Sequence, residues 1–382
     1  FHKVSSKSAL DNYFLTPIGR VMSSANNTAD GSEQQEYNFH REAHVKYFKS
    51  ILNVMPSPYE SIDTSRLTAL YFSVTGLDIL GELDSIDKRE ISEFLLSLQL
   101  VDHSSSRSAD SGVSVGDSSG FIGGNFANHS LCTLCRPEEC KTTSCTSCSP
   151  LILHNHDMYH QGHIAMTYTA LVTLLTIGDG LERVNKKAMI QGLKALQMPD
   201  GAFRATLEDS GEADVRFLFC ACAISSVLND WTSVDQERAV SYILRCITYE
   251  GGIAVLPDGE ATGGSCYCAV ASLVLMGRLG ALSGQAIEDL ARWCEARQVG
   301  GYQGRTNKDP DSCYSFWVGA TLKLLGRFDC TDLPSTRTFL LRDCQQGQYS
   351  GGFSKLPDTY ADVLHSFYSI CWLSMADFPH LR

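Results

Sequence analysis

Two kinds of helical segment alternate along the chain from Gly162 onward. Segments such as "HIAMTYTALVTLLTIG" and "FLFCACAIS" are apolar on nearly every side, whereas "ERVNKKAMIQGLKALQ" and "DQERAVSYILRCI" carry one apolar face. Helices of the first kind are typical of a buried layer, and amphipathic helices cover such a layer from outside. Each pair closes on a glycine turn, with a period of about fifty residues, at Gly201, Gly252, Gly301 and Gly352. The pattern predicts repeated helical hairpins in two concentric layers.

An open solenoid and a closed α/α toroid both satisfy this pattern, because each hairpin buries its apolar face only against its neighbours. Polar and ionisable residues recur at the same end of the apolar segments, which favours closure around a shared centre. We therefore predict an all-α fold, an α/α toroid (α-α barrel) with a central apolar cavity. Upstream, "TSRLTALYFSVTGLDILGEL" and "DKREISEFLLSLQ" predict another hairpin of the same kind.

The toroid is predicted to span residues 36–382, after a polar N-terminal tail at 1–35. The tract at about 101–150 does not fit the repeat, because it is rich in Ser, Gly, Asp and Cys and nearly free of large apolar side chains. We interpret it as a flexible insertion. Its "CTLCRPEECKTTSCTSC" run is consistent with a structural zinc site or with a thiol-rich loop that binds no metal, since its C-x-x-C pairs lie closer together than in common zinc ribbons.

Composition narrows the class of protein. The formal net charge of −12 argues against binding to nucleic acid or to an anionic membrane surface. The chain has no run of eighteen apolar residues, and "FHKVSSKSALDNYF" at its start has no signal-peptide core, so we expect a cytoplasmic protein without a transmembrane segment. Many of the 15 Cys residues lie in apolar helical segments, which indicates reduced thiols in the core.

Candidate metal chemistry lies in "NKDPDSCYSFW". Asp311 is placed to cap a helix that starts near Cys313. Cys313 and His365 follow the glycine turns of their own hairpins by twelve and thirteen residues, so we expect them on neighbouring buried helices. An Asp oxygen, a Cys thiolate and a His nitrogen would hold one zinc ion with the fourth position open. The alternative is an N-cap beside ordinary core residues.

Cations surround this motif. Arg305 and Lys308 lie just upstream, and Tyr314 follows Cys313. Arginine and lysine bind phosphate oxygens, and a tyrosine hydroxyl can stabilise charge on a leaving oxygen. The alternative is a solvated basic loop. Thiol activation beside a diphosphate site indicates alkylation of sulfur by an allylic diphosphate.

Three segments of the chain resemble a known protein family. The segments "GGYQGRTNKDPDSCYSFWVGATLKLLG", "GGFSKLPDTYADVLHSFYSICWLS" and "HIAMTYTALVTLLTIGD" resemble the β subunit of protein prenyltransferases, most closely the geranylgeranyl type I enzymes, over most of Glu36 to Met375. The resemblance implies an obligate heterodimer with a helical-repeat α subunit. It implies transfer of geranylgeranyl from geranylgeranyl diphosphate to the Cys of a C-terminal CaaX sequence, usually one ending in Leu. The implied clients are CaaX-terminal small GTPases of the Rho, Rac and Rap type.

The resemblance also assigns roles to single positions. The implied zinc ligands are Asp311, Cys313 and His365. The implied diphosphate contacts are Arg305, Lys308 and Tyr314. The positions near the CaaX peptide are His163, Glu212, Arg216, Phe72, Leu364 and Trp317.

Two positions bear on which lipid and which metal are used. Thr68 stands where farnesyl enzymes carry a Trp that limits the lipid tunnel, and the smaller side chain leaves room for one more isoprene unit. Lys355 falls ten residues before His365, where magnesium-using farnesyl enzymes carry an Asp. We therefore predict that Lys355, with Tyr314, acts catalytically on the departing diphosphate, so that turnover needs zinc but not magnesium.

Two other positions depart from the geranylgeranyl type I pattern. Thr262 stands where the family has a His that helps to bind the diphosphate, and a threonine offers a hydrogen bond but no charge. Tyr368 is closer to the farnesyl pattern. The alternatives are therefore a farnesyltransferase β subunit, a Rab geranylgeranyltransferase β subunit, which would not read a CaaX box, and a non-enzymatic α/α repeat scaffold. Arg216 and "SFWVGATLKLLG" favour the CaaX type, and the absence of an Asp-rich acid motif argues against a terpene cyclase.

Overall fold

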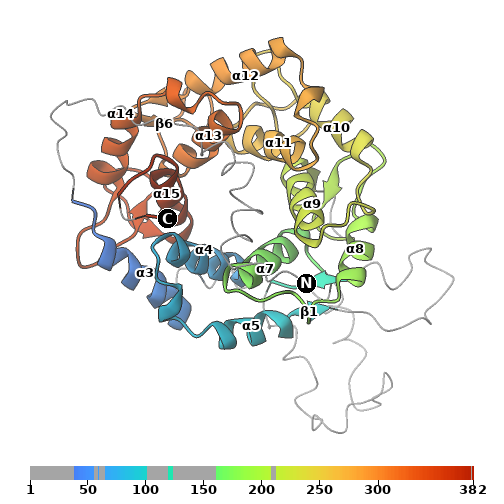
Figure 1. The fold of residues 1–382 in the computed structure, drawn as a ribbon. Helices are drawn as coiled ribbons and strands as arrows, with labels where there is room; N and C mark the ends of the chain where they lie inside the picture. Colours follow the sequence, from blue (N-terminus) through green and yellow to red (C-terminus); the bar gives the residue numbers. More distant parts are fainter. Residues whose placement is uncertain are drawn as a thin grey trace, which may run out of the picture.

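The computed structural model describes residues 38–55, 59, 65–100, 119–123, 161–207, 212–379 and 381–382. Helices in these ranges form an inner and an outer ring (Figure 1). The inner ring consists of α4 (Arg66–Ile79), α7 (Ile164–Thr176), α9 (Val215–Leu228), α11 (Gly263–Leu275), α13 (Ser312–Leu324) and α15 (Val363–Met375). The outer ring consists of α3 (Arg41–Asn53), α5 (Lys88–Ser97), α8 (Lys186–Ala195), α10 (Gln236–Arg245), α12 (Gly284–Glu295) and α14 (Leu333–Thr338), which a π-helical turn (Phe339–Cys344) continues.

The inner ring is closed. Each inner helix packs against the next one along the chain, and α15 packs against α4. The predicted α/α toroid is thereby confirmed, and the open solenoid is excluded.

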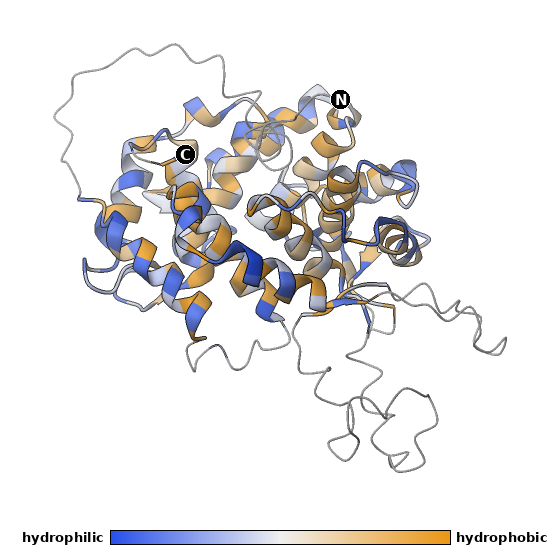
Figure 2. Ribbon diagram, turned by 60° about the horizontal axis from the view of Figure 1, so that its bottom comes forward, coloured by the Kyte–Doolittle hydropathy of each residue, from blue (hydrophilic) through white to orange (hydrophobic). Residues whose placement is uncertain are grey.

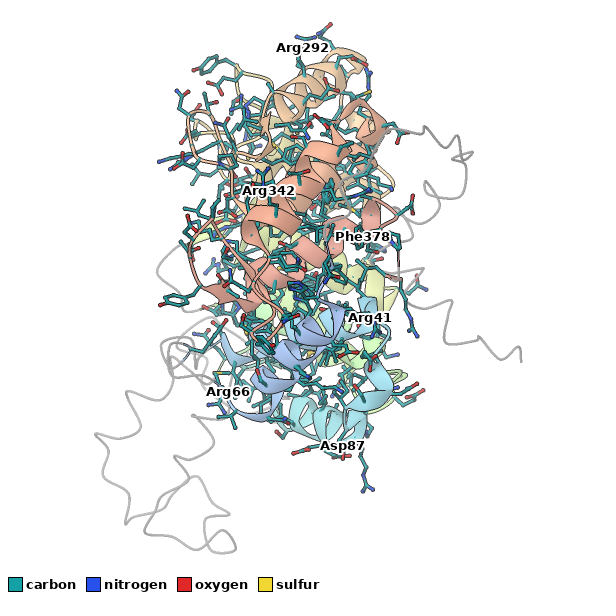
Figure 3. The ribbon with its side chains drawn as sticks, turned by 90° about the vertical axis from the view of Figure 1, so that its left-hand side faces the viewer. Arg41, Arg66, Asp87, Arg292, Arg342 and Phe378 are labelled. Atoms are coloured by element: carbon teal, nitrogen blue, oxygen red, sulfur yellow. The ribbon has the colours of Figure 1, made fainter. Side chains whose placement is uncertain are left out.

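Hydropathy explains the two layers. Nearly every residue of α11 is buried, whereas α10 buries only Ala239, Val240, Tyr242 and Ile243 along one stripe. Figure 2 shows the same contrast, with polar and apolar residues interleaved along the outer helices. In the side view, long charged side chains such as Arg292 and Arg342 lie on the outer layer (Figure 3). Within the described ranges, no helix is both long enough and apolar enough to cross a membrane.

Short antiparallel ladders connect the outer helices to the next inner helices. The paired strands are β1 (Gln99–Leu100) with β2 (Gly120–Phe121), β3 (Phe203–Arg204) with β4 (Ala213–Asp214), β5 (Gln298–Val299) with β6 (Gly301–Tyr302), and β7 (Phe353–Ser354) with β8 (Ala361–Asp362). The register sets Phe203 opposite Asp214 and Phe353 opposite Asp362. Asp214 and Asp362 are also the N-caps of α9 and α15, so these two ladders fix where the following inner helix begins.

Two glycines of the turns, Gly201 and Gly351, are required by close approach of the backbone. A Cβ atom on Gly201 would lie 2.1 Å from the carbonyl oxygen of Arg238, and one on Gly351 would lie 2.2 Å from that of Ala43. Both residues also have positive φ, at +100° and +66°, which other residues rarely adopt. These two glycine turns thus pack directly on the outer helices α10 and α3.

Within the predicted insertion at about 101–150, the structure describes residues 119–123, of which Gly120–Phe121 pairs with β1. The cysteine run from Cys132 to Cys148 and the predicted tail at 1–35 lie outside the described residues.

Candidate active site

The predicted metal ligands meet at one end of the inner ring. Asp311 is the N-cap of α13 and Cys313 lies in its first turn, while His365 lies in the first turn of the adjacent α15. One ligand atom from each of the three residues lies within 4.8 Å of the others. The Asp311 Oδ1 and His365 Nε2 atoms are 3.2 Å apart. The geometry therefore brings together the three residues that the sequence suggested.

Asp362 holds His365 in place, a role that the sequence analysis missed. The Asp362 side chain caps α15, with Oδ1 accepting the backbone N–H of His365 at 2.9 Å and Oδ2 accepting from the ring Nδ1 at 2.6 Å. The other ring nitrogen, Nε2, is thus directed at Asp311. Asp362 precedes His365 by three residues, and Asp311 precedes Cys313 by two. This recurrence of an acid shortly before a ligand residue was the sequence signal that could have identified Asp362.

Burial and hydrogen bonding set the protonation of this cluster. Burial alone would lower the pKa of His365, but hydrogen bonds to Asp311 and Asp362 outweigh it and raise the pKa to about 9. Burial would raise the pKa of Asp311, but hydrogen bonds with His365 and Cys313 lower it overall. Burial, followed by the nearby Asp311 carboxylate, raises the pKa of the Cys313 thiol well above its usual range. Protons thus occupy positions that a metal ion would take, and metal binding would release them.

This donor set fits zinc. One sulfur, one imidazole nitrogen and one carboxylate oxygen are ordinary zinc ligands, and three protein ligands leave a fourth position for a substrate atom. Asp311 and Cys313 are each only 6% exposed, so these two ligand residues are shielded from solvent. His365 lies next to them on the neighbouring helix.

Lys355 lies beside the ligand set. Its Nζ is 3.8 Å from Asp311 Oδ2, and its side chain is more than half exposed. The Lys355 carbonyl accepts the backbone N–H of Ser312 at 3.0 Å, and the Ser312 hydroxyl donates to the carbonyl of Ser354 at 2.7 Å. These bonds attach the end of β7 to the start of α13, so the ammonium group is positioned at the rim of the site.

The predicted diphosphate residues lie in the loop before α13 and in its first turn. Arg305 Nη1 donates to Glu260 Oε2 at 2.6 Å, and Lys308 is exposed. The Tyr314 ring packs so closely on Gly304 that a Cβ there would lie 2.2 Å from it. Burial, followed by the nearby Cys313 and Asp311, raises the pKa of Tyr314 to about 12, which keeps its hydroxyl protonated.

Thr262 has a structural task. It is the N-cap of α11, and its Oγ1 accepts the backbone N–H of Ser265 at 3.2 Å and lies 2.7 Å from the Ser265 hydroxyl. Its side chain is therefore already engaged within the helix cap.

An apolar cavity of about 290 Å³ lies inside the inner ring. Thr68, Phe72, Arg216 and Trp317 line it together with residues that the sequence analysis did not assign to a cavity, including Tyr71, Tyr168, Phe219, Tyr267, Phe316 and Phe367. Tyr368, the position that is closer to the farnesyl pattern, also lines it. Thr68 Oγ1 lies 3.8 Å from the Met166 sulfur at the junction of α4 and α7. Aromatic side chains at successive inner helices are the signal that would have found the rest of this lining.

The other predicted peptide residues are distributed around the same end of the ring. Arg216 pairs with Asp214 at 2.6 Å and with Glu212 at 2.9 Å. His163 caps α7 by accepting the Ala165 N–H on Nδ1 at 3.1 Å. Leu364 is partly buried against the core and, among the described residues, is not part of the cavity lining.

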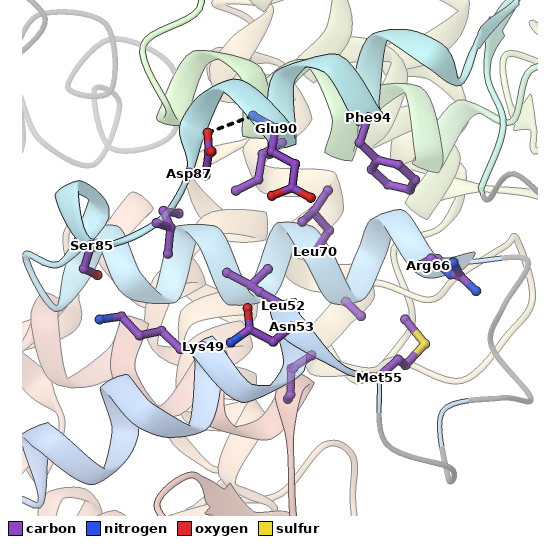
Figure 4. A pocket seen from close by; sticks show the side chains of 14 residues that line it. Lys49, Leu52, Asn53, Met55, Arg66, Leu70, Ser85, Asp87, Glu90 and Phe94 are labelled. Atoms are coloured by element: carbon purple, nitrogen blue, oxygen red, sulfur yellow. Dashed lines mark hydrogen bonds between the residues drawn. The ribbon is translucent and has the colours of Figure 1, made fainter.

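A second cavity, of about 660 Å³, lies between α3, α4 and α5 (Figure 4). Its lining mixes charged and apolar groups, among them Lys49, Arg66, Asp87, Glu90 and Phe94. None of the predicted site residues lines it, and the described ligand set lies on other helices. The axial cavity is therefore the better candidate for the substrate site, although it is smaller.

The described chain is thus an α/α toroid with an Asp-Cys-His ligand set at one end of its inner helices and an axial apolar cavity between them. A model of the prenyltransferase α/α toroid domain matches residues 39–382. The chain belongs to this family, as a prenyltransferase β subunit.

Named relatives support this assignment. The chain is 36% identical over 351 residues to the geranylgeranyl transferase type-1 subunit beta of Arabidopsis thaliana, covering 89% of this chain and 86% of that protein. It is 37% identical over 341 residues to the subunit of the same name in Dictyostelium discoideum, covering 88% and 91%. Its fold matches a solved structure of Candida albicans protein geranylgeranyltransferase-I complexed with GGPP, with a TM-score of 0.73 and 22% identity over 90% of this chain and 93% of that one. The predicted family, fold and prenyltransferase class are confirmed.

Proposed function

We propose that this chain is the β subunit of a heterodimeric type I protein geranylgeranyltransferase. The observation that carries the proposal is the placement of the three ligand residues, Asp311, Cys313 and His365, on the inner helices that also enclose the apolar cavity. The two relatives that match at 36% and 37% identity bear the name of that subunit. In this proposal one zinc ion and geranylgeranyl diphosphate are required, and magnesium is not.

The residues around the cluster divide the work of the reaction. Asp311, Cys313 and His365 would hold zinc, which when bound would lower the pKa of a substrate cysteine and present its thiolate. Lys355 supplies positive charge beside Asp311, where a departing diphosphate would gain charge. The protonated Tyr314 hydroxyl offers a neutral hydrogen bond to the same leaving group.

The remaining groups position the two substrates. Arg305 and Lys308 are the cations that would bind the diphosphate. Thr262 lies at the same rim of the site, but its hydroxyl is already engaged in a helix cap. The cavity would take the isoprenoid chain, with the small Thr68 side chain leaving room for a C20 lipid. The CaaX peptide would lie near Arg216, Glu212, His163, Phe72, Leu364 and Trp317. The implied partners are an α subunit and Leu-ending CaaX proteins of the Rho, Rac and Rap type.

A competition assay tests this function. The chain is co-expressed with a prenyltransferase α subunit, and geranylgeranyl and farnesyl diphosphates compete for CaaX peptides that end in Leu or Ser. We expect the C20 lipid on the Leu-ending peptide to be preferred. A preference for farnesyl would support the alternative, a farnesyltransferase β subunit, to which Tyr368 in the cavity lining also points.

The metal assignment has its own test. Cys313→Ala in the heterodimer should remove most of the bound zinc and lower turnover by more than about a hundredfold, because loss of a direct ligand should exceed the 10–100-fold typical of outer-shell changes. Cys330→Ser is the matched control, since Cys330 is an exposed thiol away from the cluster. Full activity and zinc content in Cys313→Ala would rule out the assignment.

A further inference from the structure

We propose that Glu260 restrains Arg305 in the free enzyme and thereby weakens binding of the substrate diphosphate. The inference rests on the proposed function and adds a residue that sets substrate affinity. Arg305 Nη1 lies 2.6 Å from Glu260 Oε2, and this charged hydrogen bond occupies one arm of the guanidinium fork. A diphosphate that uses the whole fork must displace the carboxylate.

The two loops that carry this pair are joined by the backbone. The N–H of Gly263, at the start of α11, donates to the carbonyl of Gly304 at 2.8 Å. On either side of that bond, an Ala254–Ala261 bridge precedes α11 and a Gln303–Pro310 bridge precedes α13. The backbones of Glu260 and Arg305 are therefore held close together, which favours the ion pair between their side chains.

Packing ties the same loops to the site. The Tyr314 ring contacts both glycines so closely that a Cβ on Gly263 would lie 3.0 Å from it and one on Gly304 would lie 2.2 Å from it. The Glu260–Arg305 pair thus belongs to the rim of the candidate active site, next to a residue of α13.

The charges on this rim indicate that Glu260 competes with the diphosphate for Arg305 and does not help Arg305 to bind it. The α11 loop contributes a carboxylate from Glu260 and no cation from Thr262, whose Oγ1 is engaged with Ser265. Arg305 and Glu260 side chains are 42% and 54% exposed, so an entering anion can reach the guanidinium without unfolding either loop. Two anions would then compete for one cation, and Glu260 would also repel the diphosphate.

Glu260→Gln tests the proposal in the purified heterodimer, with equilibrium binding of geranylgeranyl diphosphate and of inorganic pyrophosphate as probes. Because an exposed ion pair has modest strength, we expect both probes to bind about threefold more tightly at low salt. The gain should shrink as salt screens the pair, and the KM for the peptide should stay unchanged. Glu288→Gln is the matched control, because Glu288 is 53% exposed and pairs with Arg327 on the outer layer.

A double-mutant cycle decides whether the effect passes through Arg305. In an Arg305→Gln background, Glu260→Gln should change affinity much less than it does alone. The proposal is overturned if Glu260→Gln tightens binding in the Arg305→Gln background as much as it does alone. It is also overturned if Glu260→Gln alone leaves the affinity unchanged or weakens it. Weaker binding would mean that the carboxylate orients Arg305 for the substrate. A wild-type heterodimer that binds no geranylgeranyl diphosphate would instead contradict the proposed function.

Discussion

The Asp362 carboxylate accepts a 2.6 Å hydrogen bond from the His365 Nδ1 atom and thereby directs Nε2 at Asp311, 3.2 Å away. The same carboxylate caps the backbone of α15 at His365. A single side chain therefore fixes where α15 starts, how the imidazole is oriented, and which ring nitrogen would face a metal ion. Partners of this kind hold a metal ligand in one tautomer and increase its basicity.

Asp362→Asn should weaken zinc binding by about 10- to 100-fold, because the amide can still cap the helix but no longer attracts the Nδ1 proton with a full charge. Competition with a chelator of known affinity measures this change in the heterodimer. Asp214→Asn, which alters the equivalent cap of α9, is the control for helix capping. Equal losses of zinc affinity in both variants would show that the effect is structural.

Thr68→Trp should shift lipid choice toward the shorter isoprenoid. Thr68 lines the axial cavity, and an indole there would fill space that the last isoprene unit needs. Because even a single methylene is worth about 1–3 kcal/mol in an apolar pocket, the C20-to-C15 ratio of kcat/KM should fall at least about tenfold. Leu70→Trp, also on α4 but in the lining of the second cavity, is the matched control. An unchanged ratio in Thr68→Trp would mean that another residue limits lipid length.

Lys355→Ala should lower kcat by about a hundredfold, because one preorganised cation would be lost from the developing charge of the leaving diphosphate. The KM for the peptide should change little. The wild-type rate should be flat from zero to millimolar magnesium, since the ammonium already supplies the charge. Lys186→Ala, an exposed lysine of the outer α8, controls for loss of surface charge. Marked stimulation of the wild type by magnesium would contradict the assigned role of Lys355.

The two helical layers and the candidate metal ligands could be predicted from the sequence because both follow the repeat. Inner and outer helices differ in hydropathy, and the spacing from the glycine turns predicts Cys313 and His365 on neighbouring helices. The contact between α15 and α4 could not be predicted in this way, because no local pattern encodes a meeting of the two ends of a chain. From the sequence, a closed toroid was therefore only favoured over an open solenoid, and the structure shows that the ring is closed.

Loop-to-loop contacts were equally hidden. The pairing of Glu260 with Arg305 depends on how two successive ladders stack, and residue spacing alone does not determine that. Asp362 was within reach of sequence reasoning, since capping acids recur at the inner helices. The insertion gave no such signal, although its residues Gly120–Phe121 join the first ladder.

His44 links the two ends of the chain in the closed ring. This buried residue of α3 accepts the Gly352 N–H on Nδ1 at 2.9 Å, so Nε2 carries the proton that bonds Gln345 Oε1, also at 2.9 Å. These contacts connect positions 301 and 308 residues apart and hold the turn at Gly352 against the outer helix α3. Burial is the main reason that the pKa of His44 falls to about 4, against a weaker raising effect of Gln345 and a small lowering one of the nearby His40.

Protonation of His44 at Nδ1 should therefore break its hydrogen bond with the Gly352 N–H. Because the folded-state pKa is lowered from 6.5 to about 4, the unfolded chain binds the proton more readily, and stability falls as pH drops through this window. The expected loss is ~2 kcal/mol at pH 5 relative to neutral pH. Thermal unfolding of wild type and His44→Gln between pH 7 and 4.5 measures it: the variant should start less stable and lose less on acidification. His40→Gln, which keeps the His44 contacts, should follow the wild-type slope, and a wild-type slope in His44→Gln would place the acid sensitivity elsewhere.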